Sequence, residues 1–281
     1  MLTRIFLSAI VHDFMADSIR TAHSSQNVTW GSHMRATLLA ALLATSAVIS
    51  FGATNKPVPA YIGKAVADSS RPEEDRKLDA LRKPGEVLAF AGVKPGQVVG
   101  EFLPGGGYYT RLLSDVVGPR GRVYALETTR WGKDNIEATR KVLHEPHREN
   151  VIMDLAVFGN FHLPQKVDLF WTTLNYHDLH VERYGKVDIA AFNRHVFDSL
   201  KHGGIYLIVD HAATPGSGIQ AAPDLHRIDE ASVVSEVKAA GFVAAGESDI
   251  LHNPADDHTK KVFDPAVKWQ TDQFVLKFRK P

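Results

Sequence analysis

Four residues with side chains suited to acid, base or metal chemistry follow two apolar runs in the second half of the chain. His177 and Asp178 come shortly after the run 167–173, and Asp210 and His211 stand at the end of the run that begins at residue 205. A histidine titrates near neutral pH, and a neighbouring carboxylate can orient its ring toward a proton that must be removed. We therefore predict that His177 is a catalytic base and that Asp178 or Asp210 orients it. The competing interpretation is that His177 only caps its loop.

Histidine and aspartate are also ligands that divalent transition metals accept, so these four residues together with His226 could gather a metal ion. The chain has 14 histidines, and most of them are expected to be ordinary surface or packing residues. The five candidates show no close spacing of the kind that is typical of a metal motif. The sequence therefore leads us to assign no metal ligand.

A glycine-rich turn follows another apolar run, which begins at residue 98. Pro104, Gly105, Gly106 and Gly107 come directly after it. Glycine has no Cβ and tolerates positive φ, so such a turn can press its backbone against a ligand while the next helix points its first N–H groups at the same place. The pattern is compatible with a nucleotide-type ligand and equally with a plain structural turn.

Two carboxylates flank this turn and favour the nucleotide interpretation. Glu101 stands at the end of the first apolar run, and Glu127 ends the run 122–127. An acid roughly 20 residues beyond such a turn commonly accepts hydrogen bonds from both ribose hydroxyls. Thr110 occupies the place of the third glycine of a dinucleotide fingerprint, which disfavours a nicotinamide-dependent oxidoreductase.

The elements that must position these residues alternate between strand and helix. Strand signals cover 98–103, 122–127, 151–154, 167–173, 205–210, 242–247 and 273–277, and the main helix signals cover 134–143, 189–200 and 232–240. Such alternation predicts an α/β fold with a parallel sheet whose ligands lie beyond the carboxyl ends of the strands. No long helix separates the last two strands. We therefore predict a Rossmann-like, seven-stranded, mostly parallel sheet with helices on both faces and a C-terminal antiparallel edge hairpin.

Three polar features could cover or complete a site at this edge of the sheet. The charged face of the helix 70–82 is most simply solvated. The polar segment 251–258 is a lid or a plain hairpin. Arg227 pairs with a substrate carboxylate or, as the simpler alternative, with an internal acid.

Several of these motifs together resemble class I S-adenosylmethionine-dependent methyltransferases, and more narrowly their exported bacterial "predicted methyltransferase" branch. The segments that carry the resemblance are 101–110, 175–178, 200–204, 209–211, 226–229 and 253–257, and it extends from about residue 70 to the C-terminus. The chain departs from the broad superfamily at Leu103, where glycine is usual, and near the third strand, where Asn160 stands in place of an acid.

The resemblance implies S-adenosyl-L-methionine as cofactor and methyl transfer to an unidentified acceptor, for which we expect a small molecule. It places the backbone of the glycine turn against the amino-acid end of the cofactor, Glu127 on the ribose, and Asn160 with Phe161 near the adenine. It also suggests that Arg76, Asp79 or Arg82 of the helix 70–82 closes over the cofactor. The implied cofactor-binding residues are Glu101, Pro104, Gly105, Gly106, Gly107, Tyr109, Glu127, Asn160, Phe161 and Asn175. A non-catalytic module that binds an adenosine-like ligand on the same scaffold is the alternative from another functional class.

The composition excludes some functions and leaves others open. The chain of 281 residues contains 32 Lys and Arg residues and 32 Asp and Glu residues, so its net charge is zero. Its charge therefore gives no reason to expect nucleic-acid binding. Cysteine is absent, which excludes disulfides, thiolate zinc sites and cysteine nucleophiles. The sequence predicts no particular oligomeric state.

The N-terminal part of the chain has the form of an export signal. Residues 34–53 carry one positive charge followed by an apolar core, as secretory signal peptides do. We divide the chain into a non-native or misassigned extension (1–33), a signal peptide (34–60), a helical segment (61–97) and a methyltransferase-like domain (98–281). We expect an exported, periplasmic protein with no stable membrane span after cleavage.

Overall fold

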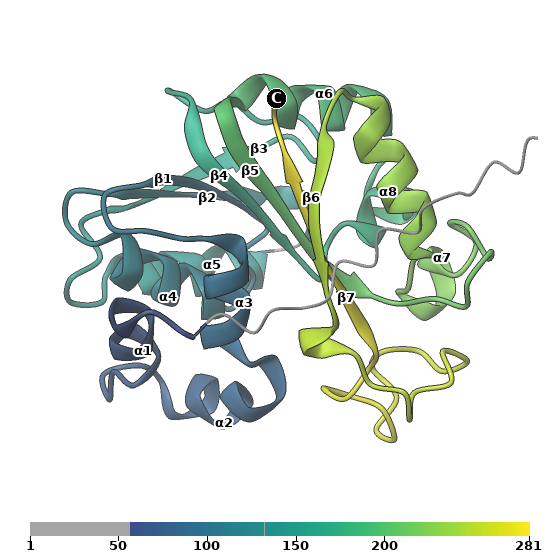
Figure 1. Ribbon diagram of the computed structural model, residues 1–281, viewed down its shortest axis with the longest axis horizontal. Helices are drawn as coiled ribbons and strands as arrows, with labels where there is room; N and C mark the ends of the chain where they lie inside the picture. Colours follow the sequence, from purple (N-terminus) through teal and green to yellow (C-terminus); the bar gives the residue numbers. More distant parts are fainter. Residues whose placement is uncertain (1–56, 132) are drawn as a thin grey trace, which may run out of the picture. The chain divides into compact units, whose positions relative to one another are not determined.

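The computed structural model describes residues 57–131 and 133–281, and its centre is one seven-stranded sheet in the order β3-β2-β1-β4-β5-β7-β6 (Figure 1). The strands are β1 (Val98–Phe102), β2 (Arg122–Thr128), β3 (Val151–Ala156), β4 (Val167–Thr173), β5 (Leu200–His211), β6 (Val243–Ser248) and β7 (Gln273–Arg279).

Strand directions follow the predicted pattern. The strands β1 to β5 pair in parallel, while β7 lies between β5 and β6 and runs antiparallel to both. The inner strands β1 and β4 are buried over most of their length, which is why they appear in the sequence as almost continuous apolar runs. The predicted fold class is confirmed, including the antiparallel pair that closes the sheet.

Helices cover both faces of the sheet (Figure 1). On one face lie α1 (Ala60–Val66), α3 (Pro84–Ala91), α4 (Tyr108–Val117) and α5 (Lys133–Leu143). On the other face lie α6 (Ile189–Ser199) and α8 (Glu230–Ala239). The apolar side chains of α4 all enter the core, because Leu112, Leu113, Val116 and Val117 recur at helical spacing.

The helix expected over 70–82 is α2 (Glu73–Arg82), which starts three residues later than its first sequence signal, directly after Pro72. Three acids occupy its first turn, where the positive end of the helix dipole favours them. Lys83 has a φ of 42°, in the left-handed region, and joins α2 to α3 without a loop. This joint sets α2 beside the carboxyl ends of the strands.

Shorter elements fill the connections at the same edge of the sheet. They are the single-turn helices η1 (Thr129–Trp131), η2 (His177–His180), η3 (Glu182–Tyr184) and η4 (Asp249–Leu251), with the short helix α7 (Ala222–Leu225). Between η4 and β7, residues 252–272 contain no helix or strand. We call this segment the C-terminal loop.

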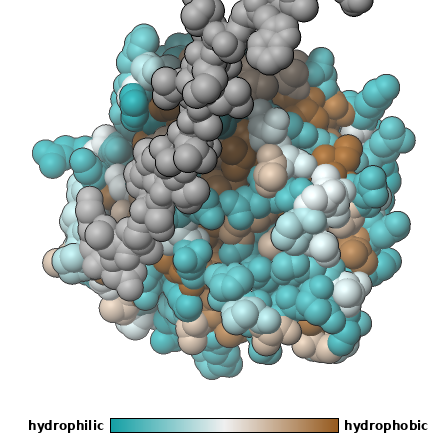
Figure 2. Space-filling model, turned by 45° about the vertical axis from the view of Figure 1, so that its right-hand side comes forward, coloured by the Kyte–Doolittle hydropathy of each residue, from teal (hydrophilic) through white to brown (hydrophobic). Residues whose placement is uncertain are grey.

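The surface drawn in Figure 2 is mostly hydrophilic outside the grey atoms, with apolar residues in separate patches. Exposed large apolar side chains include Val157, Phe263 and Trp269. Within 57–131 and 133–281, no helix combines the length and hydrophobicity that a membrane span requires. The extension 1–33 and nearly all of the signal peptide 34–60 lie outside the described residues, and α1 begins at Ala60.

Candidate functional site

Two adjoining cavities lie at the carboxyl ends of β1, β4 and β5. One, of about 340 Å³, is lined by Glu101 and the glycine turn, and we call it the turn cavity. The other, of about 570 Å³, is lined by His177, Asp178 and His226, and we call it the histidine cavity. Both are lined by Leu78, Arg82, Tyr109, Thr173, Leu174, Asn175 and Trp269. A ligand in one cavity would therefore border a ligand in the other.

The glycine turn uses its three glycines in different ways. Pro104, Gly105 and Gly106 line the turn cavity, and nothing lies within 4 Å of a Cβ built on Gly105 or Gly106. Gly107 has a φ of 80°, and a Cβ there would lie 2.4 Å from Cγ2 of Val142 on α5. Gly107 thus provides the close packing between helices, while its two neighbours leave backbone open to a ligand.

Two leucines with positive φ stand at the ends of neighbouring strands. Leu103 follows β1 with a φ of 53°, and Leu174 follows β4 with a φ of 58°. The left-handed region is costly for a residue with a Cβ, which explains why glycine suits the position of Leu103. The Asn175 side chain donates to the carbonyl oxygens of Phe102 at 3.2 Å and Leu103 at 2.8 Å. Asn175 therefore holds the strained bend and also lines both cavities. The sequence analysis expected it among the residues around a ligand.

Glu101 is a buried carboxyl group on the wall of the turn cavity. Burial raises its pKa to about 8, and the nearby Glu127 contributes to the same shift. Among the described residues, Oε2 of Glu101 has no hydrogen-bond partner. A buried acid without a partner is stabilised by a cation or a hydrogen-bond donor, so this wall suits a ligand that carries one.

Glu127 occupies the end of β2 but lines neither cavity. Its side chain is fully buried, and the Thr139 hydroxyl donates to Oε1 at 2.7 Å. Burial raises the pKa of Glu127. Its Oε2 has no partner among the described residues. The contact between Glu127 and a ribose stays a prediction. It requires that the ligand reach Oε2 of Glu127, which lies behind Gly105.

Phe161 and Asn160 do not line the cavities. A bridge between Val157 and Asn160 makes a tight turn after β3 that leaves Asn160 exposed. This turn directs Phe161 into the core, where its ring centroid lies 5.0 Å from that of Phe170. The expected contact of Phe161 with an adenine stays a prediction, and in this structure the ring has core partners instead. Tyr109 instead presents an aromatic surface to both cavities, with Trp171 packed behind it at 4.8 Å.

The histidine cavity brings together the predicted catalytic residues. His177 begins η2 just after β4, and Asp210 stands near the end of the neighbouring β5. One carboxylate oxygen of Asp210 accepts the backbone N–H of His177 at 2.7 Å, and the other lies 2.7 Å from Nδ1 of its ring. Neighbouring parallel strands end at the same edge, and this is how residues far apart in sequence meet. Asp210 orients His177, and Asp178 lies on the other side of the ring.

The charges around His177 do not suit a free base. Burial alone would lower the pKa of His177, but the carboxylates of Asp210 and Asp178 outweigh burial and raise it to about 10. Burial likewise raises the pKa of Asp178, yet His177 and His226 outweigh it and leave that pKa below its usual value. A protonated imidazole has no lone pair with which to take a proton. The raised pKa favours the protonated ring in this arrangement, and the role of His177 as a general base stays a prediction.

His226 completes the cluster and was missing from the predicted site residues. Its backbone N–H donates to the carbonyl oxygen of Ala222, the first residue of α7, and its φ of 55° turns it out of the helix. Its Nδ1 lies 3.1 Å from Nε2 of His177 and 3.3 Å from Oδ1 of Asp178. The sequence named His226 among five residues that could gather a metal, but assigned it no role in the site.

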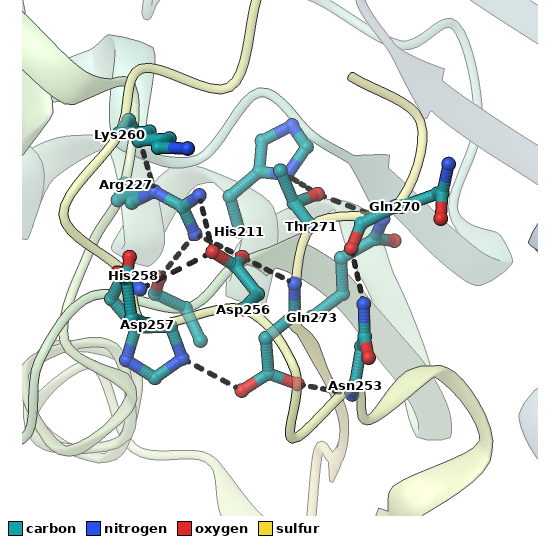
Figure 3. A network of polar contacts seen from close by, with 12 residues as sticks. His211, Arg227, Asn253, Asp256, Asp257, His258, Lys260, Gln270, Thr271 and Gln273 are labelled. Carbon is teal, nitrogen blue, oxygen red and sulfur yellow. Dashed lines mark hydrogen bonds and ion pairs between the residues drawn. The ribbon is translucent and has the colours of Figure 1, made fainter. Parts of the chain in front are cut away.

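Arg227 forms the internal ion pair that was the simpler of its two expected roles. Its fully buried guanidinium donates to Asp256 at 2.8 and 3.1 Å and to the backbone oxygens of Ala212 and Lys260. Figure 3 shows Arg227 facing Asp256 of the C-terminal loop. Asp256 also accepts the backbone N–H of Asp272 at 2.7 Å. The C-terminal loop is thereby fastened to the end of β5, and its Val262, Phe263, Lys268 and Trp269 wall the histidine cavity.

The helix α2 forms the opposite wall. Of its three residues that could close over a ligand, Arg82 lines both cavities. Its guanidinium carbon lies 4.5 Å from the ring centroid of Tyr108 and 5.5 Å from that of Trp269. Asp79 instead receives bonds from Arg71 and from the Tyr108 hydroxyl, so its role is to hold this wall in place.

Solved structures with this fold are known. A SAM-dependent methyltransferase from Aquifex aeolicus aligns with a TM-score of 0.53 at 19% identity, over 80% of this chain and 100% of its own. An S-adenosylmethionine-dependent methyltransferase from Mesorhizobium loti aligns with a TM-score of 0.51 at 16% identity, over 72% of this chain and 99% of its own.

The cyclase SpnF aligns with a TM-score of 0.51 at 16% identity, over 76% of this chain and 85% of its own. No protein-family model and no curated protein matches the sequence. The chain therefore has the fold of the class I methyltransferases. Since one such fold belongs to a cyclase, the reaction must be argued from the site.

Proposed function

We propose that this protein binds S-adenosyl-L-methionine in the turn cavity and transfers its methyl group to a small molecule held in the histidine cavity. The observation that carries the proposal is the junction of the two cavities at Tyr109 and Asn175, with the open glycine backbone and Glu101 on one side and a larger cavity on the other. A donor and an acceptor can lie end to end across this junction.

The chemistry of the turn cavity suits this cofactor. S-adenosylmethionine carries a cationic amino group, a carboxylate and a sulfonium. Oε2 of Glu101, which has no partner among the described residues, suits the amino group, and the backbone at Gly106, where a Cβ would meet nothing within 4 Å, suits the carboxylate. Solved proteins of the same fold include S-adenosylmethionine-dependent enzymes and an N-methyltransferase complexed with sinefungin.

The histidine cavity suits a small acceptor with both apolar and polar parts. Leu78, Leu81 and Phe263 offer apolar contacts, while the His177 cluster offers polar ones. Methyl transfer from a sulfonium is an in-line displacement, in which a protein contributes chiefly by aligning the two reactants and excluding water. The walls from α2 and the C-terminal loop provide that enclosure.

Calorimetric titration of the full chain with S-adenosylmethionine, S-adenosylhomocysteine and NADH tests the cofactor. We expect both sulfur ligands to bind and NADH not to bind. Near pH 7 the cationic amino group should drive a proton off Glu101, so binding enthalpies in two buffers of different ionisation enthalpy should reveal proton release. Glu101→Gln should abolish that release and weaken binding about tenfold or more. Glu137→Gln, on the exposed side of α5, is the matched control.

Failure of both sulfur ligands to bind would reject the proposed cofactor. Binding followed by transfer of a labelled methyl group to a component of a small-molecule extract would support the enzyme. Binding without transfer to any component would favour the non-catalytic module.

We also propose that the protein is exported. The support is the signal-like segment 34–53, which precedes the described residues. Expression of the full chain in a bacterium, followed by fractionation and N-terminal sequencing of the product, tests this. Recovery of the uncleaved chain in the cytoplasmic fraction would contradict it.

A further inference from the structure

We propose that Nε2 of His177, Oδ1 of Asp178 and Nδ1 of His226 form a binding site for one divalent transition-metal cation in the histidine cavity. The site goes beyond the proposed methyl transfer and does not depend on it. It would give the cavity a fixed positive charge that can bind an oxygen atom of a ligand.

The three atoms form a triangle of the size that a metal requires. Nε2 of His177 lies 3.1 Å from Nδ1 of His226 and 3.3 Å from Oδ1 of Asp178, and the third side is also 3.3 Å. A cation about 2.1 Å from each ligand, at tetrahedral or octahedral angles, sets its ligand atoms about 3.0–3.4 Å apart. No rotation of the backbone is needed to bring the ligands together.

The carboxylate oxygen in this triangle has only two polar neighbours, both at long distance. Asp178 is 4% exposed, and its Oδ1 meets no well-formed hydrogen bond among the described residues, since the ring nitrogens of His177 and His226 lie 3.3 Å away. A buried carboxylate oxygen left in this state is costly, and native structures seldom contain one without a reason. A cation at the centre of the triangle would satisfy it directly.

A second carboxylate fixes the orientation of one ligand. Oδ1 of Asp210 lies 2.7 Å from Nδ1 of His177, and Asp210 is fully buried. When a metal displaces the proton of Nε2, the proton held between these two atoms stays on Nδ1, and the lone pair of Nε2 is then free to bind the metal. A carboxylate behind a histidine ligand is the usual second layer of a metal site, where it sets the tautomer and the direction of the ring.

The positively charged Arg183 contacts one of the proposed ligands and so disfavours a bound cation. Its replacement therefore gives the sharpest test of the proposal. Nη2 of Arg183 lies 2.5 Å from Nε2 of His226, so this guanidinium donates to the ring and keeps the ring proton on Nδ1. Metal binding requires that the proton move to Nε2 and that Arg183 withdraw. Arg183 lies on the exposed η3 and also donates to the backbone oxygen of Pro223, so it can do so without disturbing the core.

The ligand set selects a class of metal. Two imidazoles and one carboxylate suit Zn²⁺, Fe²⁺, Co²⁺ or Mn²⁺, whereas Mg²⁺ and Ca²⁺ prefer oxygen ligands. His177, Asp178 and His226 all line the histidine cavity, so the remaining coordination positions would be open to it. A cation there would lower the pKa of a bound water or hydroxyl group.

The test is calorimetric titration of the chelator-treated full chain with ZnCl₂ and with CoCl₂, with MgCl₂ as the contrast. We expect one equivalent of Zn²⁺ and of Co²⁺ to bind, with visible absorption of the bound Co²⁺, and Mg²⁺ to bind far more weakly. Asp178→Asn and His226→Ala should each weaken binding by about 100-fold or more, and Asp210→Asn by about 10–100-fold. Arg183→Gln should strengthen it.

His252→Ala is the matched control, because His252 also pairs with an aspartate, Asp272, but lies outside the cluster. Its Zn²⁺ affinity should equal that of the unaltered chain. Thermal melting of each chelator-treated variant separates loss of the site from loss of the fold, and Asp178→Asn preserves the shape of its side chain. Absence of stoichiometric binding, or equal affinity in Asp178→Asn and the unaltered chain, would overturn the proposal. Because the titrations contain no methyl donor, their outcome is independent of the S-adenosylmethionine experiment.

Discussion

The two cavities differ in how their buried charges are balanced. The turn cavity contains Glu101, a carboxyl group with no ion-pair partner, whose pKa is raised to about 8 by burial. In the histidine cavity, the Asp178 carboxylate lies 3.3 Å from the rings of His177 and His226, and the buried Asp210 lies behind His177. The turn cavity therefore lacks a positive charge, which a ligand can supply. The histidine cavity can exchange a proton for another cation once Arg183 withdraws from His226.

The histidine cavity also differs in that one wall, the C-terminal loop, is held by the buried ion pair of Arg227 and Asp256. Arg227→Met tests this pair and has the largest expected effect. The change leaves Asp256 buried without its partner, so the free energy of unfolding should fall by about 3–5 kcal/mol. Urea unfolding measures this. Lys201→Met breaks the half-exposed pair with Asp168 and should cost less than about 1 kcal/mol. Equal losses in the two variants would show that the C-terminal loop is not fastened by its ion pair.

Glu101→Gln tests the unbalanced charge of the turn cavity. Because burial raises the pKa of Glu101 from 4.5 to about 8, its contribution to stability is complete below pH 4.5 and is lost as the pH rises through 8. The variant lacks this loss, so at pH 8 its free energy of unfolding should exceed that of the unaltered chain by about 3–4 kcal/mol. Urea unfolding between pH 4 and 9 measures the difference, and parallel pH profiles would contradict it.

Gly107→Ala and Gly106→Ala separate packing from ligand contact in the turn. Alanine at 107 combines a positive φ with a Cβ 2.4 Å from Val142, so it should lower the free energy of unfolding by about 2–4 kcal/mol. Alanine at 106 meets nothing within 4 Å and should leave stability nearly unchanged while weakening S-adenosylmethionine binding. Denaturant unfolding and calorimetry measure the two effects, and equal losses of stability would contradict the assignment.

Arg82→Gln tests the wall that the two cavities share, with the smallest expected effect. The guanidinium contacts Trp269, which is 47% exposed, so its loss should reduce the free energy of unfolding by less than about 1 kcal/mol. Faster dissociation of S-adenosylmethionine, measured by stopped flow, should accompany it. An unchanged dissociation rate would show that α2 does not help to enclose the ligand.

The sequence predicted the fold and the local parts of the site because these depend on short-range patterns. The alternation of apolar runs placed all seven strands, and the glycine turn placed Glu101 and its neighbours at one cavity. Asn175 also lies where its strand signal put it.

Features that depend on distant neighbours were beyond the sequence. The direction of Phe161 is set by one tight turn after β3, which no periodic pattern encodes. The protonation of His177 depends on Asp210, 33 positions away, and its neighbour His226 is 49 positions away. The sequence offered these side chains as a possible cluster, but their distances follow only from the meeting of strand ends in the folded sheet.

The last strand of the chain lies inside the sheet, and this has a consequence for synthesis. β7 pairs with β5 on one side and β6 on the other, so until residues 273–279 have left the ribosome β6 has no partner strand and β5 has only β4. Until then β5 presents a long apolar edge, which invites pairing with other chains. The sheet therefore cannot close until β7 has been made, and a nascent chain exposes this edge up to that point.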